Sequence, residues 1–251
     1  MHAFPVAVQP YTIRSALATN YVDALERLAS IGYKGIELGL PPDGMSITEQ
    51  KAVLDRLGLH VIGTHAGFDT LDFDADRLAD YLDQIEGGRY VTISLRLHSR
   101  EDILAKAVRM NEIGKQFRDR GITFLYHNHD WEFTRFDGEY ALDLLLNATD
   151  PELVKTELDT YWIKRGGEDP VTYLQTLSGR APLLHIKDME AGDEQLFAEI
   201  GTGILNFRAI AQVAQQIGVE CLVVEQDECR QDPFESLQIS YTNLRELGIM
   251  L

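Results

Sequence analysis

The feature of this sequence that most constrains its fold is a series of short β-rich runs, each followed by a segment with apolar residues at helical spacing. The runs are FPVAVQ, KGIELG, HVIGTH, YVTISLRL, ITFLYHNH, LVKTELDTYW, PLLHIKD and ECLVVEQD. They recur about every thirty residues, as in parallel βαβ units. Asn20 precedes one predicted helix as a cap, Ser46 and Glu49 have capping-box spacing, and predicted helices end at glycine in SIGYKG, RLGLH, DRGITF and QIGVE.

Eight such units in 251 residues predict an α/β fold, a (β/α)8 TIM barrel that forms a single domain over residues 1–251. A doubly wound open sheet is the alternative, but it usually has a glycine-rich phosphate turn after the first strand. Here the first run leads into QPYTIR, which has no such turn. Two of the segments between the runs have apolar residues at helical spacing: Tyr21, Ala24, Leu25, Leu28 and Ile31, and Ile103, Leu104, Ala107, Val108 and Ile113.

The formal net charge of −17 argues against nucleic acid or an anionic membrane as partner, because phosphate binding requires clustered Lys and Arg. No apolar run reaches the ~18 residues that a membrane span needs, and the start, MHAFPVAVQPYTIR, does not resemble a signal peptide. Cys221 and Cys229 fit no common zinc or redox spacing and are expected to be reduced thiols. We therefore expect a cytoplasmic protein.

The strand-like runs begin apolar and become polar at their C-terminal ends. The polar residues there are Gln9, Glu37, His65, Arg96, His127, His129, Glu157, Asp159, His185, Lys187, Glu225 and Asp227. In a TIM barrel this end is the catalytic mouth, and alternation along a strand places residues two apart on one face. Mixed imidazole and carboxylate donors suit Mn, Co, Zn, Mg or Fe. Asp159, His185 and Glu225, at matching heights on three successive strands, predict one divalent metal ion.

Structural roles are the alternative for each of these residues. A histidine at a strand end is often simply hydrogen-bonded, Asp159 could cap the turn that follows it, and Lys155 could pair with Glu157. Trp131 and Trp162 could form an apolar wall or pack at the barrel mouth. The two glycines of IGTGILNF precede a predicted helix, so their backbone N–H groups could bind an anion, although the pattern is short.

Several longer stretches resemble one family, the sugar phosphate isomerase/epimerase group of xylose-isomerase-like TIM barrels. They are VQPYTIR, LASIGYKGIELG, YHNHDWEF, ELDTYWIKRGGEDPV, LLHIKD, IGTGILNF and LVVEQD, and they span almost the whole chain. The resemblance implies an enzyme that isomerises, epimerises, dehydrates or cleaves a sugar, keto-sugar or cyclitol. We expect a small-molecule carbohydrate as the partner, unphosphorylated rather than phosphorylated, and a possible homo-oligomer.

Members of that family hold one divalent ion with a Glu, an Asp, a His and a second Glu. By motif, the resemblance assigns Asp159, His185 and Glu225 to the last three of these positions. The first Glu is absent here: His127 stands at that position, and Glu132 of the same YHNHDWEF motif could instead turn back as a ligand. We favour His127, and the fourth ligand stays open.

The chemistry that the resemblance implies is removal of a proton next to a carbonyl group. Glu225 is the expected base, and Glu132 or a histidine of YHNH is the second group. Lys187 is expected to stabilise negative charge or to protonate a leaving hydroxyl. The expected substrate contacts are His65, Glu37, Gln9, Arg96, His129 and Trp162. The same residues could serve an isomerase/epimerase or, as the alternative, a dehydratase or lyase.

Two other functions receive less support from the sequence. An apurinic-site endonuclease of the same fold would need a second histidine in a D-T-x-H pattern, where this chain has Trp162, and the negative charge opposes DNA binding. A non-catalytic sugar-binding barrel would lack a base, whereas Glu225 and Lys187 are present. Metal content and exchange of a substrate hydrogen with solvent distinguish these possibilities.

Overall fold

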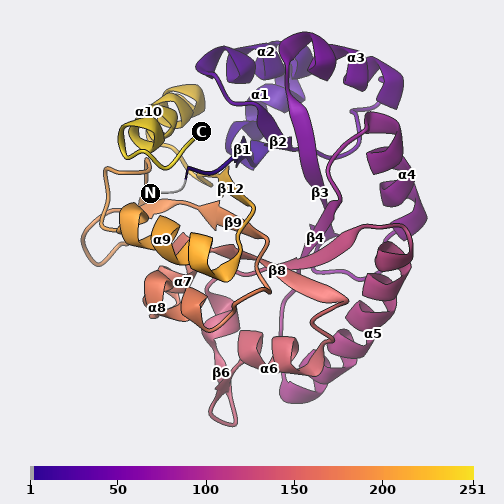
Figure 1. Ribbon diagram of the computed structural model, residues 1–251, viewed down its shortest axis with the longest axis vertical. Coiled ribbons are helices and arrows are strands. Elements are labelled where there is room, and N and C mark those ends of the chain that lie inside the picture. The colour runs from indigo at the N-terminus through magenta and orange to yellow at the C-terminus, as the bar shows by residue number, and fades with distance from the viewer. Residues whose placement is uncertain (1–2) are drawn as a thin grey trace.

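The computed structural model describes residues 3–251, in which eight parallel strands close into a barrel with the helices outside it (Figure 1). Around the barrel the order is β1, β12, β9, β8, β5, β4, β3 and β2. The barrel strands are β1 (Val6–Val8), β2 (Gly35–Glu37), β3 (His60–Phe68), β4 (Tyr90–Ser94), β5 (Thr123–His127), β8 (Val154–Asp159), β9 (Leu183–Ile186) and β12 (Cys221–Val224). The predicted TIM barrel is confirmed.

The helices follow the strands in the expected alternation. They are η1 (Pro10–Ile13), α1 (Arg14–Thr19), α2 (Tyr21–Ile31), α3 (Ile47–Leu57), α4 (Ala75–Ile85), α5 (Arg100–Asp119), η2 (Trp131–Phe133), α6 (Ala141–Ala148), α7 (Thr160–Arg165), α8 (Pro170–Gln175), α9 (Phe207–Ile217) and α10 (Pro233–Glu246). Phe4 and Met250 form a parallel bridge, so the two ends of the described chain lie together beside the β1–β12 pair that closes the ring (Figure 1).

The local signals for helix starts and ends are confirmed. The Asn20 side chain accepts from the N–H of Asp23 at the start of α2, and Ser46 and Glu49 form both bonds of a capping box at the start of α3. Gly58 and Gly218 end α3 and α9 in the left-handed conformation, which glycine adopts without steric cost. These helices are therefore delimited by residues that the sequence alone identifies.

The predicted helix α5 is present, but only part of its apolar set is buried. Leu104 and Val108 are exposed, 44% and 62% of their surface respectively, whereas Met110 and Phe117 are buried together with the predicted Ile103. The helix is longer than the apolar pattern that predicted it, and its buried stripe is shifted around the helix axis. Two antiparallel hairpins were also not predicted. They are β6 (Arg135–Phe136) with β7 (Glu139–Tyr140), and β10 (Asp188–Met189) with β11 (Phe197–Ala198).

The barrel interior has an apolar floor below a polar upper layer. The floor is a small cluster of Ala7, Leu125, Leu183, Cys221 and Val223. Because side chains two apart on a strand share a face, the next inward residues are Gln9, His127, His185 and Glu225. The larger core cluster fills the space between the barrel and the helices. The sheet therefore places its polar residues at the carboxyl ends of the strands, above the apolar cluster.

Two expectations concern the whole chain. Within residues 3–251, no helix combines the length and the apolar character needed to cross a membrane. Cys221 and Cys229 are free, as expected from their spacing.

Candidate active site and metal-ligand clusters

A pocket of about 560 Å³ opens at the carboxyl ends of the barrel strands. It is lined by Gln9, Tyr11, His65, Gly67, Phe68, Ser94, His127, His129, Trp131, Lys187, Glu225 and Asp227. The lining combines an aromatic wall with convergent charged groups, which is the composition of a small-molecule site. Seven of these residues were expected at the mouth from the polar strand ends: Gln9, His65, His127, His129, Lys187, Glu225 and Asp227.

Four side chains form what we call the outer cluster: His127, Asp159, His185 and Glu225, of which His127 and Glu225 line the pocket. One donor atom from each lies within 4.8 Å of the other three, and all four residues are buried. In this set, Nδ1 of His185 is 3.0 Å from Oε2 of Glu225 and 4.0 Å from Oδ2 of Asp159. Four different strands, β5, β8, β9 and β12, contribute these residues at or just beyond their carboxyl ends.

The outer cluster contains buried donor atoms that make no hydrogen bond. They are Nδ1 of His127 and Oδ2 of Asp159, the latter being in ion-pair contact with the Lys187 ammonium at 3.0 Å. Asp159 also caps α7, as considered above, but only through Oδ1, which accepts from the N–H of Trp162. Buried polar atoms are rarely left without a partner, and two imidazoles with two carboxylates suit a divalent ion. The residues present therefore fit the metal that the sequence predicts.

Lys187 is the positive charge of the site, and its side chain is almost completely buried. Its ammonium lies 3.0 Å from Oδ2 of Asp159, 2.7 Å from Oε2 of Glu225 and 3.0 Å from Oδ1 of Asp227. Burial lowers the pKa of Lys187, but these three carboxylates outweigh burial and hold its pKa above the ordinary value. Burial raises the pKa of Asp227 to about 6 against the opposing effect of Lys187.

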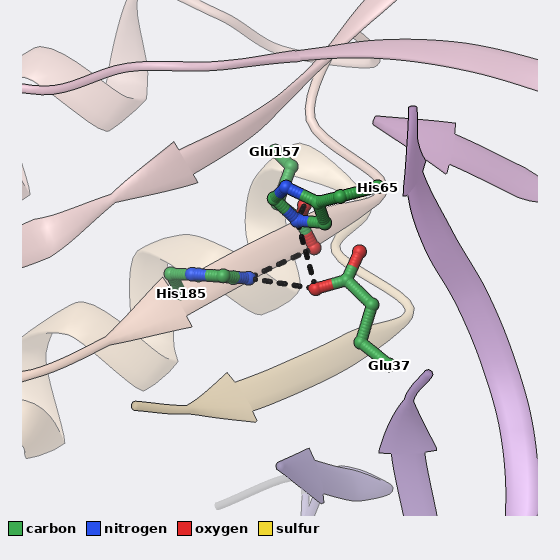
Figure 2. Close-up of side chains that lie close together, drawn as sticks. All are labelled: Glu37, His65, Glu157 and His185. Atoms are coloured by element: carbon green, nitrogen blue, oxygen red, sulfur yellow. Dashed lines mark hydrogen bonds and ion pairs between the residues drawn. The ribbon is translucent and has the colours of Figure 1, made fainter. Parts of the chain in front are cut away.

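A second group, the inner cluster, consists of Glu37, His65, Glu157 and His185 (Figure 2). Its members meet through Nε2 of His185, whereas the outer cluster uses Nδ1 of the same ring. In the sheet register Asp159 pairs with His185 but Glu157 pairs with Leu183 of the apolar floor, so Glu157 lies one layer below Asp159. Figure 2 shows the four side chains pointing at a common centre.

Glu37 was expected to contact substrate, and the structure gives it a different environment. Its side chain is fully buried and does not line the pocket. Oε2 of Glu37 accepts from the Gln9 amide at 2.8 Å and contacts Nε2 of His185 at 3.1 Å. Gln9, another expected substrate contact, does line the pocket, although its side chain is already bonded to Glu37 and to the N–H of Tyr11.

Glu132 was expected to be a catalytic group or the fourth ligand, and its contacts do not support either role. It is absent from both clusters, and its carboxyl group is fully buried against Tyr126 and His129. Oε1 lies 2.6 Å from the Tyr126 hydroxyl, and Oε2 accepts from the N–H of His129 at 2.8 Å. The short η2 helix that carries Glu132 directs it back to β5 rather than into the pocket, so Glu132 fixes the loop that presents His129.

The aromatic wall stands around His129. Its ring stacks on Trp131, with centroids 3.9 Å apart, and lies 5.4 Å from the ring of Trp162. Burial lowers the pKa of His129 to about 3, so the ring is neutral. Arg96, an expected substrate contact, is exposed and does not line the pocket; its guanidinium stacks on the outer side of the wall, 3.7 Å from the centroid of Trp131. Trp162 lies 5.5 Å from the Lys187 ammonium.

The glycine loop of IGTGILNF is occupied by the protein itself. The backbone N–H groups of Gly201, Gly203 and Leu205 all donate to the buried carboxylate of Asp188, as does the N–H of Met189. A Cβ at Gly203 would lie 2.2 Å from the carbonyl oxygen of Met189, so this approach requires glycine. The anion that the motif predicts is thus Asp188, not a phosphate of the substrate.

Several residues of the site were given no role from the sequence, among them Glu157, Asp227, Tyr11 and Phe68. Glu157 and Asp227 have the polar strand-end signal, but Glu157 was also compatible with a pair to Lys155, whose ammonium instead donates to the carbonyl of Gly179. Tyr11 and Phe68 line the pocket from η1 and from the end of β3. An aromatic residue at such a place has no periodic signal, so only the folded chain reveals it.

The comparisons with known proteins agree with this fold. The family model described as "Xylose isomerase-like TIM barrel" matches residues 25–246. Among curated proteins, the chain is similar to the inosose dehydratase of Lacticaseibacillus casei, with 24% identity over 261 aligned positions that cover 86% of this chain and 86% of that protein.

Two solved structures are similar over nearly their whole length. A sugar phosphate isomerase/epimerase from Parabacteroides distasonis has a TM-score of 0.80 and 25% identity, covering 98% of this chain and 94% of that one. The structure of the IOLI protein with a bound zinc atom has a TM-score of 0.74 and 15% identity, covering 97% of this chain and 98% of that one. At the latter identity the likeness concerns the fold.

Proposed function

The chain belongs to the xylose isomerase-like TIM barrel family, and from this premise we propose that it is a metal-dependent enzyme that removes a proton next to the carbonyl of a sugar, keto-sugar or cyclitol. The observation that carries the proposal is the outer cluster, two of whose members line the pocket, with Lys187 in contact with two of its carboxylates. A ligand set, a carboxylate base and a buried cation thus face the same pocket.

His127, Asp159, His185 and Glu225 are the residues that would hold the ion. Bound there, a divalent ion would act as a Lewis acid on the carbonyl and its neighbouring oxygen. The orientation of His185 is set by the protein, because Glu37 and Glu157 contact its Nε2 and leave Nδ1 toward the outer cluster. Such support keeps the ligand in place before the substrate arrives.

Glu225 is the base in this proposal, because it lines the pocket and belongs to the outer cluster. It takes the proton from the carbon next to the carbonyl, and the electron pair of the broken C–H bond moves into the carbon–carbon bond as the carbonyl oxygen becomes negative. Lys187, 2.7 Å from Glu225, stabilises that negative charge. Return of the proton to the former carbonyl carbon, with the neighbouring hydroxyl proton passing to the former carbonyl oxygen, gives isomerisation. Return of the proton to the opposite face of the same carbon gives epimerisation. The neutral His129 lines the pocket and is the second proton-transfer group in this proposal.

Elimination of water is the second candidate reaction, and Lys187 favours it. Its ammonium lines the pocket beside Glu225, so that an acid and a base are both available to one substrate. In this reaction Lys187 donates a proton to a hydroxyl group on the next carbon, water leaves, and a carbon–carbon double bond remains. The similarity to the inosose dehydratase supports this candidate.

The test uses manganese-loaded protein with ketoses, inososes and keto-glycosides in D2O. We expect exchange of the hydrogen next to the carbonyl, observed by NMR, and loss of both exchange and turnover in Asp159→Asn. In Lys187→Met an elimination should fall by about 100-fold or more while exchange persists; an epimerisation or isomerisation should show a similar loss in both readouts. Glu152→Gln, an exposed carboxylate at the opposite rim, is the matched control. If none of the carbonyl substrates exchanges hydrogen, the proposal is wrong.

A further inference from the structure

The inner cluster has the arrangement of ligands around a point, not that of separate ion pairs. Nε2 of His65 lies 3.1 Å from Oε2 of Glu37 and 3.3 Å from Oε2 of Glu157. Nε2 of His185 lies 3.1 Å from Oε2 of Glu37 and 3.2 Å from Oε1 of Glu157. Each ring nitrogen therefore contacts both carboxylates, whereas a single N–H group can point at only one oxygen.

These separations match the edges of a tetrahedral coordination shell. Bonds of roughly 2.0–2.1 Å from zinc to histidine nitrogen and carboxylate oxygen place tetrahedral donors roughly 3.3 Å apart. The four nitrogen–oxygen separations of the inner cluster run from 3.1 to 3.3 Å, with Glu157 presenting Oε2 to His65 and Oε1 to His185. Figure 2 shows the two rings and two carboxylates directed at the space between them.

The hydrogen bonding of the inner cluster is incomplete without a further group. Both oxygens of Glu157 and Nε2 of His65 are buried atoms with no hydrogen bond, although each lies close to a possible partner. Glu157 is fully buried, so water does not satisfy these oxygens from the surface. Unsatisfied buried carboxylate oxygens cost considerable free energy, and an ion between them would satisfy all of these atoms together.

The charges support the same conclusion. In the outer cluster, Asp159 and Glu225 are in contact with the Lys187 ammonium. For Glu37 and Glu157, by contrast, the ion pairs among the described residues involve only His65 and His185, and no lysine or arginine. A buried carboxylate needs a compensating charge, and one divalent ion would balance two carboxylates without protonation of either histidine.

We propose that Glu37, His65, Glu157 and Nε2 of His185 form a second metal site, tetrahedral and selective for a zinc-type ion, below the outer cluster. The Gln9 amide, 2.8 Å from Oε2 of Glu37, orients this carboxylate from outside the ligand shell. When both clusters are filled, His185 bridges the two ions through its two ring nitrogens as an imidazolate. The site stands independently of the reaction proposed above, because it rests on donor geometry alone.

The decisive measurement is an anomalous-scattering map of crystals of the full-length, zinc-loaded protein. A peak among the four donors of the inner cluster supports the second site, whether or not the outer cluster is also filled. No peak there, with His185 Nε2 hydrogen-bonded to Glu37 and Glu157, overturns the proposal and leaves these residues as supports of a single ion.

Variants test the site in solution. Metal analysis should find about two ions per chain in the wild type, and Glu157→Gln should lose one of them. Cobalt-loaded wild type should show the intense visible absorption of tetrahedral Co²⁺, which Glu157→Gln loses and Asp159→Asn retains. Glu132→Gln is the matched control, a buried carboxylate outside both clusters, and should keep both ions. Retention of the tetrahedral absorption in Glu157→Gln contradicts the assignment. Circular dichroism of each variant establishes that it is folded.

The failure of this proposal is distinguishable from failure of the proposed function. Absence of hydrogen exchange with carbonyl substrates counts against the reaction but does not affect the zinc peak in the inner cluster. An empty inner cluster in a protein that exchanges the substrate hydrogen counts against the second site alone.

Discussion

Glu132 shows how a single buried carboxyl group can serve a loop instead of the reaction. The Tyr126 hydroxyl lies within hydrogen-bonding distance of both the Leu95 carbonyl and Oε1 of Glu132, but it has only one proton. If Glu132 is protonated, it donates to Tyr126, Tyr126 donates to Leu95, and His129 donates to Oε2. Burial raises the pKa of Glu132 to about 8, which agrees with a protonated carboxyl at neutral pH.

This protonation predicts a pH dependence of stability. The pKa of Glu132 is higher in the folded protein, about 8, than its ordinary value of 4.5, so its contribution is complete below pH 4.5 and is lost as pH rises toward 8. At ~1.4 kcal/mol per pKa unit, the loss amounts to a few kcal/mol. Glu132→Gln does not titrate, so its free energy of unfolding, measured with urea at several pH values, should fall less than that of the wild type over this range. Equal slopes in the two proteins would contradict the assignment, and Glu152→Gln should keep the wild-type slope.

At the scale of the elements, α5 packs closely against the segment that leads into β8. Gly114 lies in the middle of this helix, where helix propensity alone favours alanine by ~1 kcal/mol. A Cβ at this position would lie 2.4 Å from the carbonyl oxygen of Leu153 and 2.9 Å from its carbonyl carbon. Backbone atoms cannot rotate away as a side chain does, so the glycine is required by packing.

We therefore expect Gly114→Ala to lower the free energy of unfolding by ~1–2 kcal/mol, because the steric cost exceeds the gain in helix propensity. Val108→Ala in the same helix is the control; Val108 is 62% exposed, and its replacement should change stability by no more than ~0.5 kcal/mol. Urea unfolding at constant pH measures both. A Gly114→Ala variant more stable than the wild type would show that α5 and Leu153 separate easily.

The connection between β11 and α9 shows the same dependence on neighbours. Asp188 follows the last barrel residue of β9 by two positions, and its carboxylate accepts from the backbone N–H groups of Gly201, Gly203 and Leu205. This contact fixes the path of the connection. The short glycine-rich sequence IGTGILNF does not by itself reveal that the anion bound by its N–H groups is the carboxylate of Asp188 in β10.

At the scale of the whole molecule, closing the barrel concentrates carboxylates in its interior. Glu37, Glu157, Asp159 and Glu225 come from three strands, β2, β8 and β12, and are all buried within two adjoining clusters. Their mutual repulsion opposes folding unless cations stand between them. Lys187 supplies one positive charge, and the proposed ions supply the rest, so metal binding and stability are expected to be linked.

Removal of metal with EDTA should therefore lower the thermal midpoint of the protein, and zinc or manganese should restore it. For an ion present at 100 times its Kd, binding contributes ~2.7 kcal/mol, equivalent to a shift of roughly 5–10 °C in a chain of this size. Calorimetry or circular dichroism measures the midpoint. The Asp159→Asn variant, which lacks an outer-cluster ligand, should show a smaller shift, and an identical shift would argue that the ion binds elsewhere.

The barrel and the location of its mouth followed from the sequence, because strand and helix periodicity, caps and glycine ends are encoded within a few neighbouring residues. The same is true of the polar strand ends that contain Asp159, His185 and Glu225. Which polar residues meet was decided only by the tertiary structure. Whether Glu157 joins Glu37 or pairs with Lys155, and whether Glu132 faces the pocket or Tyr126, depends on the stagger of the closed sheet and on the path of η2. Those contacts join residues far apart in the chain, so no local pattern specifies them.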